Sequence, residues 1–315
     1  MKVCSLFSGI GGIDLGFQQA GFDIVWANEY DKDAAKTYRH NLGSDHLIEA
    51  DIRSIDPYTI PDFDVLVAGF PCQPFSSLGK KKGFEDPRGN LFFEIARVIA
   101  VKRPSVVFLE NVSNLLQHDD GKTFLTIYNA LVPYGYAVKY RVMDSYEYAN
   151  VPQHRKRIFI VAFLDHECCE RFDFPEKIKP DVKLNDILVR SIKHDACYYY
   201  TEESVYFKDL IRCVNDKNAM YRIWDSGLSP KPYYVCPTLM ANMGYYPDRV
   251  PVILDDYGVR KITPYECLAL QGFPATFRFP KISVNSAYKQ CGNSVVVPVI
   301  KRIATQIAKA IKPTT

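Results

Sequence analysis

One cysteine of the chain stands in a setting that suits a nucleophile. Cys72 lies between Pro71 and Pro74, directly after the apolar run 65–68 and Gly69. The run predicts a strand buried on both faces, and the two prolines prevent a simple continuation as strand or helix. A thiol in a stiff turn at the carboxyl end of a strand stands where open α/β sheets bind ligands. Taken alone, Cys72 also fits an inert buried cysteine, because free cysteine is among the most buried residue types.

A carboxylate and two arginines offer chemical partners for this thiol. Glu110 directly follows the apolar run 106–109, which predicts another buried strand. At a shared sheet edge, Glu110 and Cys72 could act on one substrate as acid and nucleophile; a merely solvated glutamate is the alternative. Arg155 and Arg157 follow in a basic stretch, where an extended backbone would point both side chains the same way.

A glycine-rich turn near the N-terminus predicts a nucleotide site. The segment 9–12 follows the predicted strand 3–7, and Asp14 stands where a dinucleotide fingerprint has its third glycine. Glu29 closes the next predicted strand, in the place of a carboxylate that binds ribose hydroxyls. The pattern favours an adenosine-containing cofactor over NAD, with a βα turn of no function as the alternative. Asp51 is a further candidate, as acceptor from an adenine amino group.

Charge and aromatic residues are unevenly distributed along the chain. The net charge of +3 does not by itself indicate a nucleic-acid binder. Basic residues nevertheless cluster at 80–82 and at 154–157, and tyrosines alternate with basic residues within 183–260. Such interleaving suits nucleic-acid contact, whereas solvated surface patches and a small tyrosine core are the alternatives.

The cysteines and the apolar runs limit the class of protein. The nine cysteines include no C-x-x-C pair, so we expect no structural zinc and no other metal, and we expect reduced thiols in a cytoplasm. No run predicts a transmembrane span, and glycines with Asp14 interrupt the N-terminal apolar residues, so we expect no signal peptide.

The predicted elements alternate between strand and helix. Strands at 3–7 and 22–27, a helix at 13–20 and a helix capped by Asp31 form a βαβα start. We therefore predict the α/β class, with a parallel sheet and helices on both faces. Later strands are predicted at 136–143 and 158–164. A final helix carries an apolar stripe, with Ser294 as its cap and Pro298 in or near its first turn.

Taken in order, these motifs resemble those of the cytosine-5 DNA methyltransferase family of bacterial restriction–modification systems. The resemblance covers nearly the whole chain. It is carried by Phe7-Ser8-Gly9-Ile10-Gly11-Gly12, Asn28-Glu29-Tyr30, Asp51-Ile52, Gly69-Phe70-Pro71-Cys72-Gln73-Pro74-Phe75-Ser76, Glu110-Asn111-Val112, Gln153-His154-Arg155-Lys156-Arg157, Arg260–Glu266 with Leu270–Pro274, and Gln290–Pro298. Tyr30 stands where many relatives have tryptophan, and an aromatic ring there can still pack beside adenine.

The resemblance implies a Rossmann-like S-adenosylmethionine-dependent methyltransferase sheet and a smaller, irregular, β-rich target-recognition domain. We expect a catalytic and cofactor-binding domain at 1–182, the target-recognition domain at 183–260, and a hinge and return segment at 261–315. The implied cofactor is S-adenosyl-L-methionine, with S-adenosyl-L-homocysteine as product. The implied cofactor-binding residues are Phe7, Gly9, Ile10, Gly11, Gly12, Glu29, Tyr30, Asp51, Ile52, Pro71, Leu91 and Asn293.

The implied reaction is methylation of carbon 5 of a cytosine flipped out of duplex DNA. The Cys72 thiolate adds to carbon 6, Glu110 contacts N3 and the exocyclic amine, and Arg157 holds O2. Arg155 orients this group or a neighbouring loop. Residues 73–90 are the candidate lid over the flipped base. The expected DNA contacts are Ser76, Lys80, Lys81, Lys82, Arg88, Thr238 and Arg249.

The expected partners are duplex DNA and a restriction endonuclease that acts separately. We expect a monomer in the bacterial cytoplasm that associates with the nucleoid through DNA. A tRNA cytosine-5 methyltransferase is the nearest alternative, although the Cys-Phe-Thr element of such relatives is missing. A non-catalytic DNA-binding relative and a nicotinamide oxidoreductase are the others, the latter disfavoured by Asp14 in place of glycine.

Overall fold

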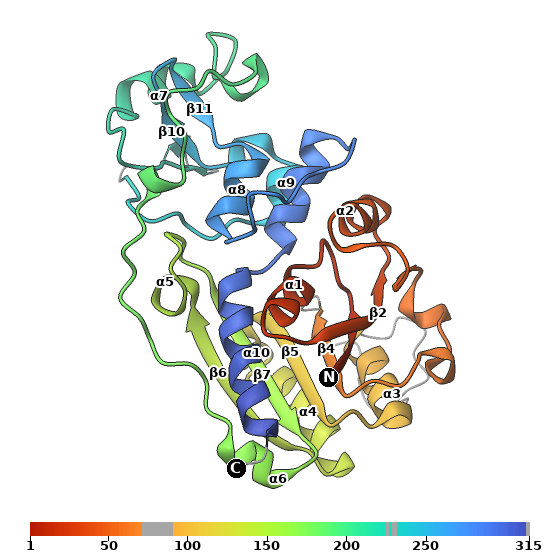
Figure 1. Cartoon of the computed structure of the whole chain (residues 1–315). Helices are drawn as coiled ribbons and strands as arrows, with labels where there is room; N and C mark the ends of the chain where they lie inside the picture. The colour runs from red at the N-terminus through yellow and green to blue at the C-terminus, as the bar shows by residue number, and fades with distance from the viewer. Residues whose placement is uncertain (71–90, 225–226, 229–231, 313–315) are drawn as a thin grey trace. The chain divides into compact units, whose positions relative to one another are not determined.

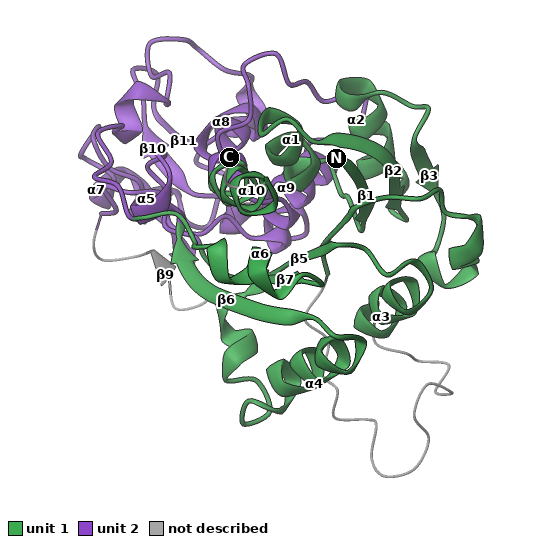
Figure 2. Cartoon of the chain, turned by 60° about the horizontal axis from the view of Figure 1, so that its bottom comes forward, with its two compact units in different colours: residues 1–144, 156–176, 299–315 green, residues 145–155, 177–298 purple. Residues whose placement is uncertain are grey.

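The computed structural model describes residues 1–70, 91–224, 227–228 and 232–312. The chain forms two compact units, one of residues 1–144, 156–176 and 299–315 and the other of residues 145–155 and 177–298 (Figure 2). No helix within the described ranges is long and apolar enough to cross a membrane. The functional domain limits at 182 and 260 stay a prediction.

The first unit is built on a seven-stranded sheet with the order β3-β2-β1-β4-β5-β7-β6 (Figure 1). Neighbours from β3 to β5 run parallel, whereas β7 is antiparallel to both β5 and β6. The predicted α/β class and Rossmann-like sheet are confirmed. The strands are β1 (Lys2–Leu6), β2 (Asp23–Glu29), β3 (Leu47–Glu49), β4 (Val65–Gly69), β5 (Val106–Val112), β6 (Ala137–Asp144) and β7 (Lys156–Phe163).

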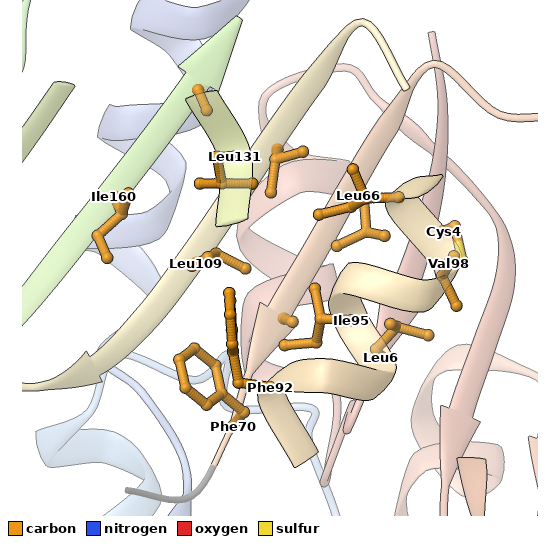
Figure 3. Close-up of a cluster of buried hydrophobic side chains, with 14 of the residues drawn as sticks. Cys4, Leu6, Leu66, Phe70, Phe92, Ile95, Val98, Leu109, Leu131 and Ile160 are labelled. Atoms are coloured by element: carbon orange, nitrogen blue, oxygen red, sulfur yellow. The ribbon is translucent and has the colours of Figure 1, made fainter. Parts of the chain in front are cut away.

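Helices cover both faces of this sheet. Alternate residues of the central strands pack against α3 and α4 in one hydrophobic cluster, which includes Leu66, Ile95 and Leu109 (Figure 3). On the other face, Phe17 of α1 contacts Phe108 edge to face, with 5.2 Å between ring centroids. The central strands are buried on both sides, which explains their unbroken apolar sequences.

The helix limits agree with the capping signals in most places. The Asp31 carboxylate accepts from the backbone N–H groups of Asp33 and Ala34, as predicted for an N-cap. The prediction for Ser294 was wrong. Ser294 follows the last residue of α9 and its N–H donates to the carbonyl of Cys291, whereas α10 begins only at Val297. The helices of the first unit are α1 (Gly12–Gln19), α2 (Lys32–Leu42), α3 (Leu91–Lys102), α4 (Lys122–Leu131), α6 (His166–Arg171) and most of α10 (Val297–Ile311).

The second unit contains mostly short elements joined by irregular chain, as predicted for its central part. β8 pairs with β9 and β10 pairs with β11, each pair antiparallel. A small apolar cluster around Leu210 and Tyr221 supports them. The elements are α5 (Ser145–Tyr148), α7 (Phe207–Cys213), β8 (Ile223–Trp224), β9 (Gly227–Leu228), β10 (Val252–Leu254), β11 (Val259–Lys261), α8 (Pro264–Leu270) and α9 (Val284–Asn293).

A fully buried ion triad connects β11 to α8 in this unit. The Arg260 Nε lies 2.7 Å from Asp255 Oδ2, and its two terminal nitrogens each lie 2.8 Å from one oxygen of Glu266. Glu266 also accepts from the backbone N–H of Thr263, whose hydroxyl caps α8. The guanidinium therefore neutralises two carboxylates that water does not reach.

Arg260→Met should destabilise the protein strongly, because it leaves Asp255 and Glu266 buried without their cation. We expect a loss of about 3–5 kcal/mol in the free energy of unfolding, measured by urea denaturation. Arg212→Met is the matched control, since its ion pair with Asp209 is exposed; its urea midpoint should stay at the wild-type value. An unchanged midpoint for Arg260→Met would contradict the role of the triad.

Candidate active site

The glycine-rich turn after β1 is shaped by backbone conformations that favour glycine. Gly9 and Gly11 have φ values of +57° and +83°, and Phe7 has +54°. The Gly11 N–H donates to the carbonyl of Ser8 and closes the turn. A Cβ at Gly11 would stand 2.1 Å from Leu42 Cδ1, whereas one at Gly9 would have no heavy atom within 4 Å. The turn is therefore packed tightly against α2 at Gly11 and open at Gly9.

Glu29 holds the turn from the end of β2. Its Oε2 accepts from the Gly9 N–H at 2.7 Å, and its Oε1 accepts from the Asp31 N–H at 2.6 Å. Burial raises the pKa of Glu29, and these two N–H groups act in the opposite direction. Each oxygen keeps a further lone pair, so the carboxylate can still accept from a pair of vicinal hydroxyl groups.

Apolar and polar residues extend this site in the first unit. Ile10, 2% exposed, lies within the turn and Gly12 begins α1. Ile52 belongs to the hydrophobic cluster against which Phe7 and Leu91 pack, so the sheet fold gathers these three predicted cofactor residues. The side chain of Tyr30 is 73% exposed.

Asp51 is bound by a neighbour. Its carboxylate accepts from Arg53 Nε at 3.0 Å and from the Arg53 backbone N–H, and it forms an ion pair with Nη2 of the same guanidinium. Hydrogen bonding to the Arg53 side chain lowers the pKa of Asp51. Asp51 is thus ionised, and Arg53 contacts both of its carboxylate oxygens.

The residue that breaks the dinucleotide fingerprint belongs to a buried hydrogen-bond network. Asp14 accepts from Ser5 Oγ at 2.5 Å and from Tyr38 Oη at 2.7 Å. The Ser8 hydroxyl donates to Ser5 Oγ, and the Tyr38 hydroxyl also lies 3.0 Å from His46 Nε2. The network connects β1, α1 and α2 beneath the glycine turn. Sequence reasoning missed this role, because Tyr38 is far from Asp14 in the chain.

Glu110 and Arg157 meet at the carboxyl edge of the sheet. The register pairs Glu110 with Gly69 of β4 on one side, and Val112 with Arg157 of β7 on the other. The Arg157 Nε lies 3.0 Å from Glu110 Oε1, and both side chains keep a small exposed fraction, 16% and 11%. Oε2 of the glutamate faces Gly69, where a Cβ would come within 3.5 Å. The pair is therefore largely desolvated and still accessible.

Asn111 is a second residue that sequence reasoning left out of the site. Its buried amide donates to the carbonyl of Phe70 at 2.8 Å, and its Oδ1 accepts from the Val112 N–H. Phe70 is the last described residue before the segment 71–90. Asn111 directly follows Glu110 in the motif Glu110-Asn111-Val112, and this position is the sequence signal that could have identified it. The predicted site residues Cys72, Pro71, Ser76, Lys80, Lys81, Lys82 and Arg88, with the predicted lid, lie outside the described residues.

The remaining predicted residues belong to the second unit. Arg155 is 3% exposed and donates to backbone carbonyls, whereas Asn293 is exposed at the end of α9. The Thr238 hydroxyl donates to the carbonyl of His154 at 2.8 Å. The backbone N–H of Arg249 donates to the carbonyl of Tyr246. Arg155 and Arg157 are only two residues apart in the chain, yet Arg155 binds backbone carbonyls whereas Arg157 binds Glu110.

Two sets of residues at one edge of the sheet could bind two different ligands in the first unit. The glycine turn, Glu29 and the apolar residues fit a nucleoside with a ribose diol, which is the chemistry that an adenosine-containing cofactor presents. The Glu110–Arg157 pair supplies a carboxyl group and a fork of N–H donors for a polar planar substrate. Among the described residues, no group of three or more His, Cys, Asp or Glu side chains could hold a metal ion.

Comparison with known proteins identifies close relatives. The family model of the C-5 cytosine-specific DNA methylase matches residues 1–309. Type II methyltransferase M.Bsp6I of Bacillus sp. (strain RFL6) is 46% identical over 314 residues, which cover 99% of each chain. Type II methyltransferase M.HhaI of Haemophilus parahaemolyticus is 34% identical over 315 residues, 99% of this chain and 95% of that protein.

Solved structures share the fold at lower identity. A mutant of Spodoptera frugiperda DNMT2 superposes with a TM-score of 0.74 at 20% identity, over 98% of this chain and 99% of that chain. A putative DNA modification methyltransferase encoded within a prophage of E. coli gives a TM-score of 0.72 at 21% identity, over 99% of each chain. At these identities the comparison supports the fold alone.

The Asp14 network makes a prediction about pH. Burial raises the pKa of Asp14 to about 6, above the value of about 3.9 of an unperturbed aspartate. The native state then binds this proton more tightly than the unfolded chain does. The contribution of Asp14 to the free energy of unfolding is therefore fully present below about pH 4 and is lost as the pH rises through about 6.

Asp14→Asn should remove this dependence, because the amide keeps an acceptor oxygen but does not titrate. Between about pH 5 and pH 7, the free energy of unfolding of the wild type should fall by about 1 kcal/mol relative to that of Asp14→Asn. Urea denaturation at both pH values measures the difference. Parallel pH profiles for the two proteins would show that Asp14 does not titrate as described.

Proposed function

The chain belongs to the C-5 cytosine-specific DNA methylase family and is a DNA (cytosine-5-)-methyltransferase, and we propose that it methylates one flipped-out cytosine in a specific short duplex sequence through a covalent Cys72 adduct. Methyltransferases of this family use S-adenosylmethionine. The proposal divides the chain into catalysis at 1–182, target recognition at 183–260 and a return segment at 261–315.

The observation that carries the proposal is the Glu110–Arg157 pair. Cytosine presents N3, the exocyclic amine and O2 along one edge. A carboxyl group can contact N3 and the amine while a guanidinium donates to O2. The 3.0 Å contact between Arg157 and Glu110 sets the two groups side by side, as neighbouring positions on that edge require. Each side chain keeps an exposed part, 16% for Arg157 and 11% for Glu110, through which it could contact the base.

Cys72 supplies the step that makes carbon 5 reactive. Bound S-adenosylmethionine offers an electrophilic methyl group on a sulfonium. The Cys72 thiolate forms a bond to carbon 6, and the electron pair of the 5,6 double bond then becomes available at carbon 5 for the methyl group. Methyl transfer would leave S-adenosyl-L-homocysteine. A base, for which water is the candidate, then takes the carbon 5 proton, and the released electron pair restores the double bond and expels the Cys72 thiolate. Glu110, hydrogen-bonded or proton-donating at N3, stabilises the charge that builds up as Cys72 adds.

The cofactor is assigned to the glycine turn and its neighbours. Glu29 would accept from the ribose hydroxyls, and Phe7, Ile52 and Leu91 would enclose the adenine with Tyr30 and Asp51 at its edge. The turn at Gly9 is open on the side where a Cβ would stand, which leaves space for the ligand. Gly9–Gly12, Pro71 and Asn293 complete the proposed set.

DNA binding is assigned to a set of basic and polar residues. Flipping is required because stacking hides carbons 5 and 6 in a duplex, and it costs a few kcal/mol. Contacts with phosphates would compensate part of this cost and make the affinity depend on salt. The proposed contacts are Ser76, Lys80, Lys81, Lys82, Arg88, Thr238 and Arg249. A cognate restriction endonuclease acting separately completes the proposal, with the methyltransferase as a monomer.

The experiment combines methyl transfer with bisulfite sequencing. Wild type should transfer a labelled methyl group to mixed-sequence duplex DNA and not to tRNA. A plasmid recovered from expressing cells should carry methylcytosine at one short motif. Cys72→Ala should abolish both signals, and Glu110→Gln should lower kcat about 10²- to 10³-fold with intact cofactor binding. Methylation of tRNA alone would replace DNA as the substrate, and full activity of Cys72→Ala would exclude the adduct.

A further inference from the structure

Arg155 is a buried cation whose guanidinium joins two separate backbone segments. Nη1 donates to the carbonyl of Leu239 at 2.7 Å, and Nη2 donates to the carbonyls of Gly292 at 3.0 Å and of Ser294 at 2.5 Å. Its side chain is nearly inaccessible, with 3% of the residue exposed. Two of the three acceptors lie at the C-terminal end of α9, where unpaired carbonyls concentrate negative potential. A fixed cation is well placed there.

The Leu239 segment is fixed to the backbone just before Arg155. The Cys236 N–H donates to the carbonyl of Pro152, and the His154 N–H donates to the carbonyl of Cys236, both at 2.8 Å. The Thr238 hydroxyl donates to the carbonyl of His154. Residues 236–239 thus lie along residues 152–154 as a short parallel bridge. The segment that carries Thr238 is therefore held by the backbone of residues 152–154.

The end of α9 packs directly on the same segment. A Cβ at Gly292 would stand 2.1 Å from the carbonyl carbon of Met240 and 2.2 Å from the nitrogen of Ala241. Only the missing side chain allows this approach. The Gln271 amide holds the carbonyl of Cys291 from the other side at 2.8 Å. Residues 236–241 and 291–294 therefore form one packed pair of segments, with Arg155 reaching across both.

We propose that Arg155 is a positioning residue that holds the target-reading segment 236–241 against the cofactor-closing segment 291–294. The proposal rests on the proposed function, which assigns Thr238 to DNA and Asn293 to the cofactor. Arg155 and Arg157 then have separate tasks, because Arg157 faces the Glu110 carboxylate and the base, whereas the Arg155 guanidinium donates to the backbone carbonyls of Leu239, Gly292 and Ser294. A ligand that fixes the segment of Thr238 would thereby help to fix the segment of Asn293, and the reverse holds equally.

The chemistry of the side chain makes a sharp test possible. A guanidinium presents separate N–H donors in a planar fork, so one group can reach Leu239 and Gly292 at the same time. A lysine ammonium keeps the charge but is a single point, so it can satisfy one segment and not both. Arg155→Lys therefore preserves the cation and removes the bridge. Arg190→Lys is the matched control, because Arg190 donates to the carbonyl of Leu254 in the same unit, outside both segments.

The first measurement is amide hydrogen exchange of the DNA-free enzyme followed by mass spectrometry. Arg155→Lys should exchange faster than wild type in peptides covering 236–241 and also in peptides covering 291–294. Arg190→Lys should exchange as wild type does in both. An unchanged rate in either segment of Arg155→Lys would overturn the bridge. This result does not depend on the covalent Cys72 reaction or on the assigned ligand sites, so failure of the bridge and failure of the proposed function are distinguishable.

The second measurement separates positioning from direct contact with the base. With unmethylated plasmid DNA, recovered from cells that express Cys72→Ala, Arg155→Lys should raise the KM for both S-adenosylmethionine and DNA on the order of tenfold, the effect of losing one charge-assisted hydrogen bond, with a smaller change in kcat. Arg157→Lys should act mainly on kcat. A fall in kcat at unchanged KM values for Arg155→Lys would show that Arg155 acts on the base, and would overturn the proposal.

Discussion

The reversal of strand order between β1 and β4 is the constraint on which the site depends. From β1 the chain proceeds outward through β2 and β3, and from β4 it proceeds in the opposite direction through β5. The carboxyl ends of β1 and β4 therefore lie at the switch point of the sheet, where open α/β sheets bind their ligands. The glycine turn and Glu29 lie on one side of this reversal, and Gly69 with Glu110 on the other. In the proposed reaction, the methyl donor and its acceptor would bind at these two neighbouring places.

The antiparallel direction of β7 brings an arginine to the carboxyl edge of the sheet, where a parallel strand in its place would not. In a parallel neighbour of β5, the first residues would lie at the opposite edge from Glu110. Because β7 runs the other way, Arg157 near its start stands opposite Val112 near the end of β5. An arginine and a carboxylate thus meet at the edge where the strands from β1 to β5 end. The antiparallel register of β7 therefore places Arg157 within reach of Glu110.

Periodicity and capping chemistry predicted much of the first unit, because its signals are local. The apolar runs before Gly69 and Glu110 are strands whose both faces are covered, and Asp31 caps α2 through its own neighbours. Long-range contacts decided the rest. In the sequence, Asp14 stands where a dinucleotide fingerprint has glycine. Its role in a buried hydrogen-bond network becomes evident only from Tyr38, which α2 places beside it. An extended backbone predicted that the side chains of Arg155 and Arg157 point the same way. In the structure, Arg157 binds Glu110 of the first unit and Arg155 binds Leu239 of the second.

We propose that Cys72 bonds covalently to carbon 6 of the target cytosine. Fluorine at carbon 5 cannot leave as a cation, so a duplex with 5-fluorocytosine at the methylated position should hold the enzyme at the adduct. Mass spectrometry of wild type with this duplex and S-adenosylmethionine should give one protein–DNA species, with the modification on the peptide that contains Cys72. A wild-type enzyme that methylates ordinary DNA yet forms no adduct, or forms it at another residue, would contradict the account.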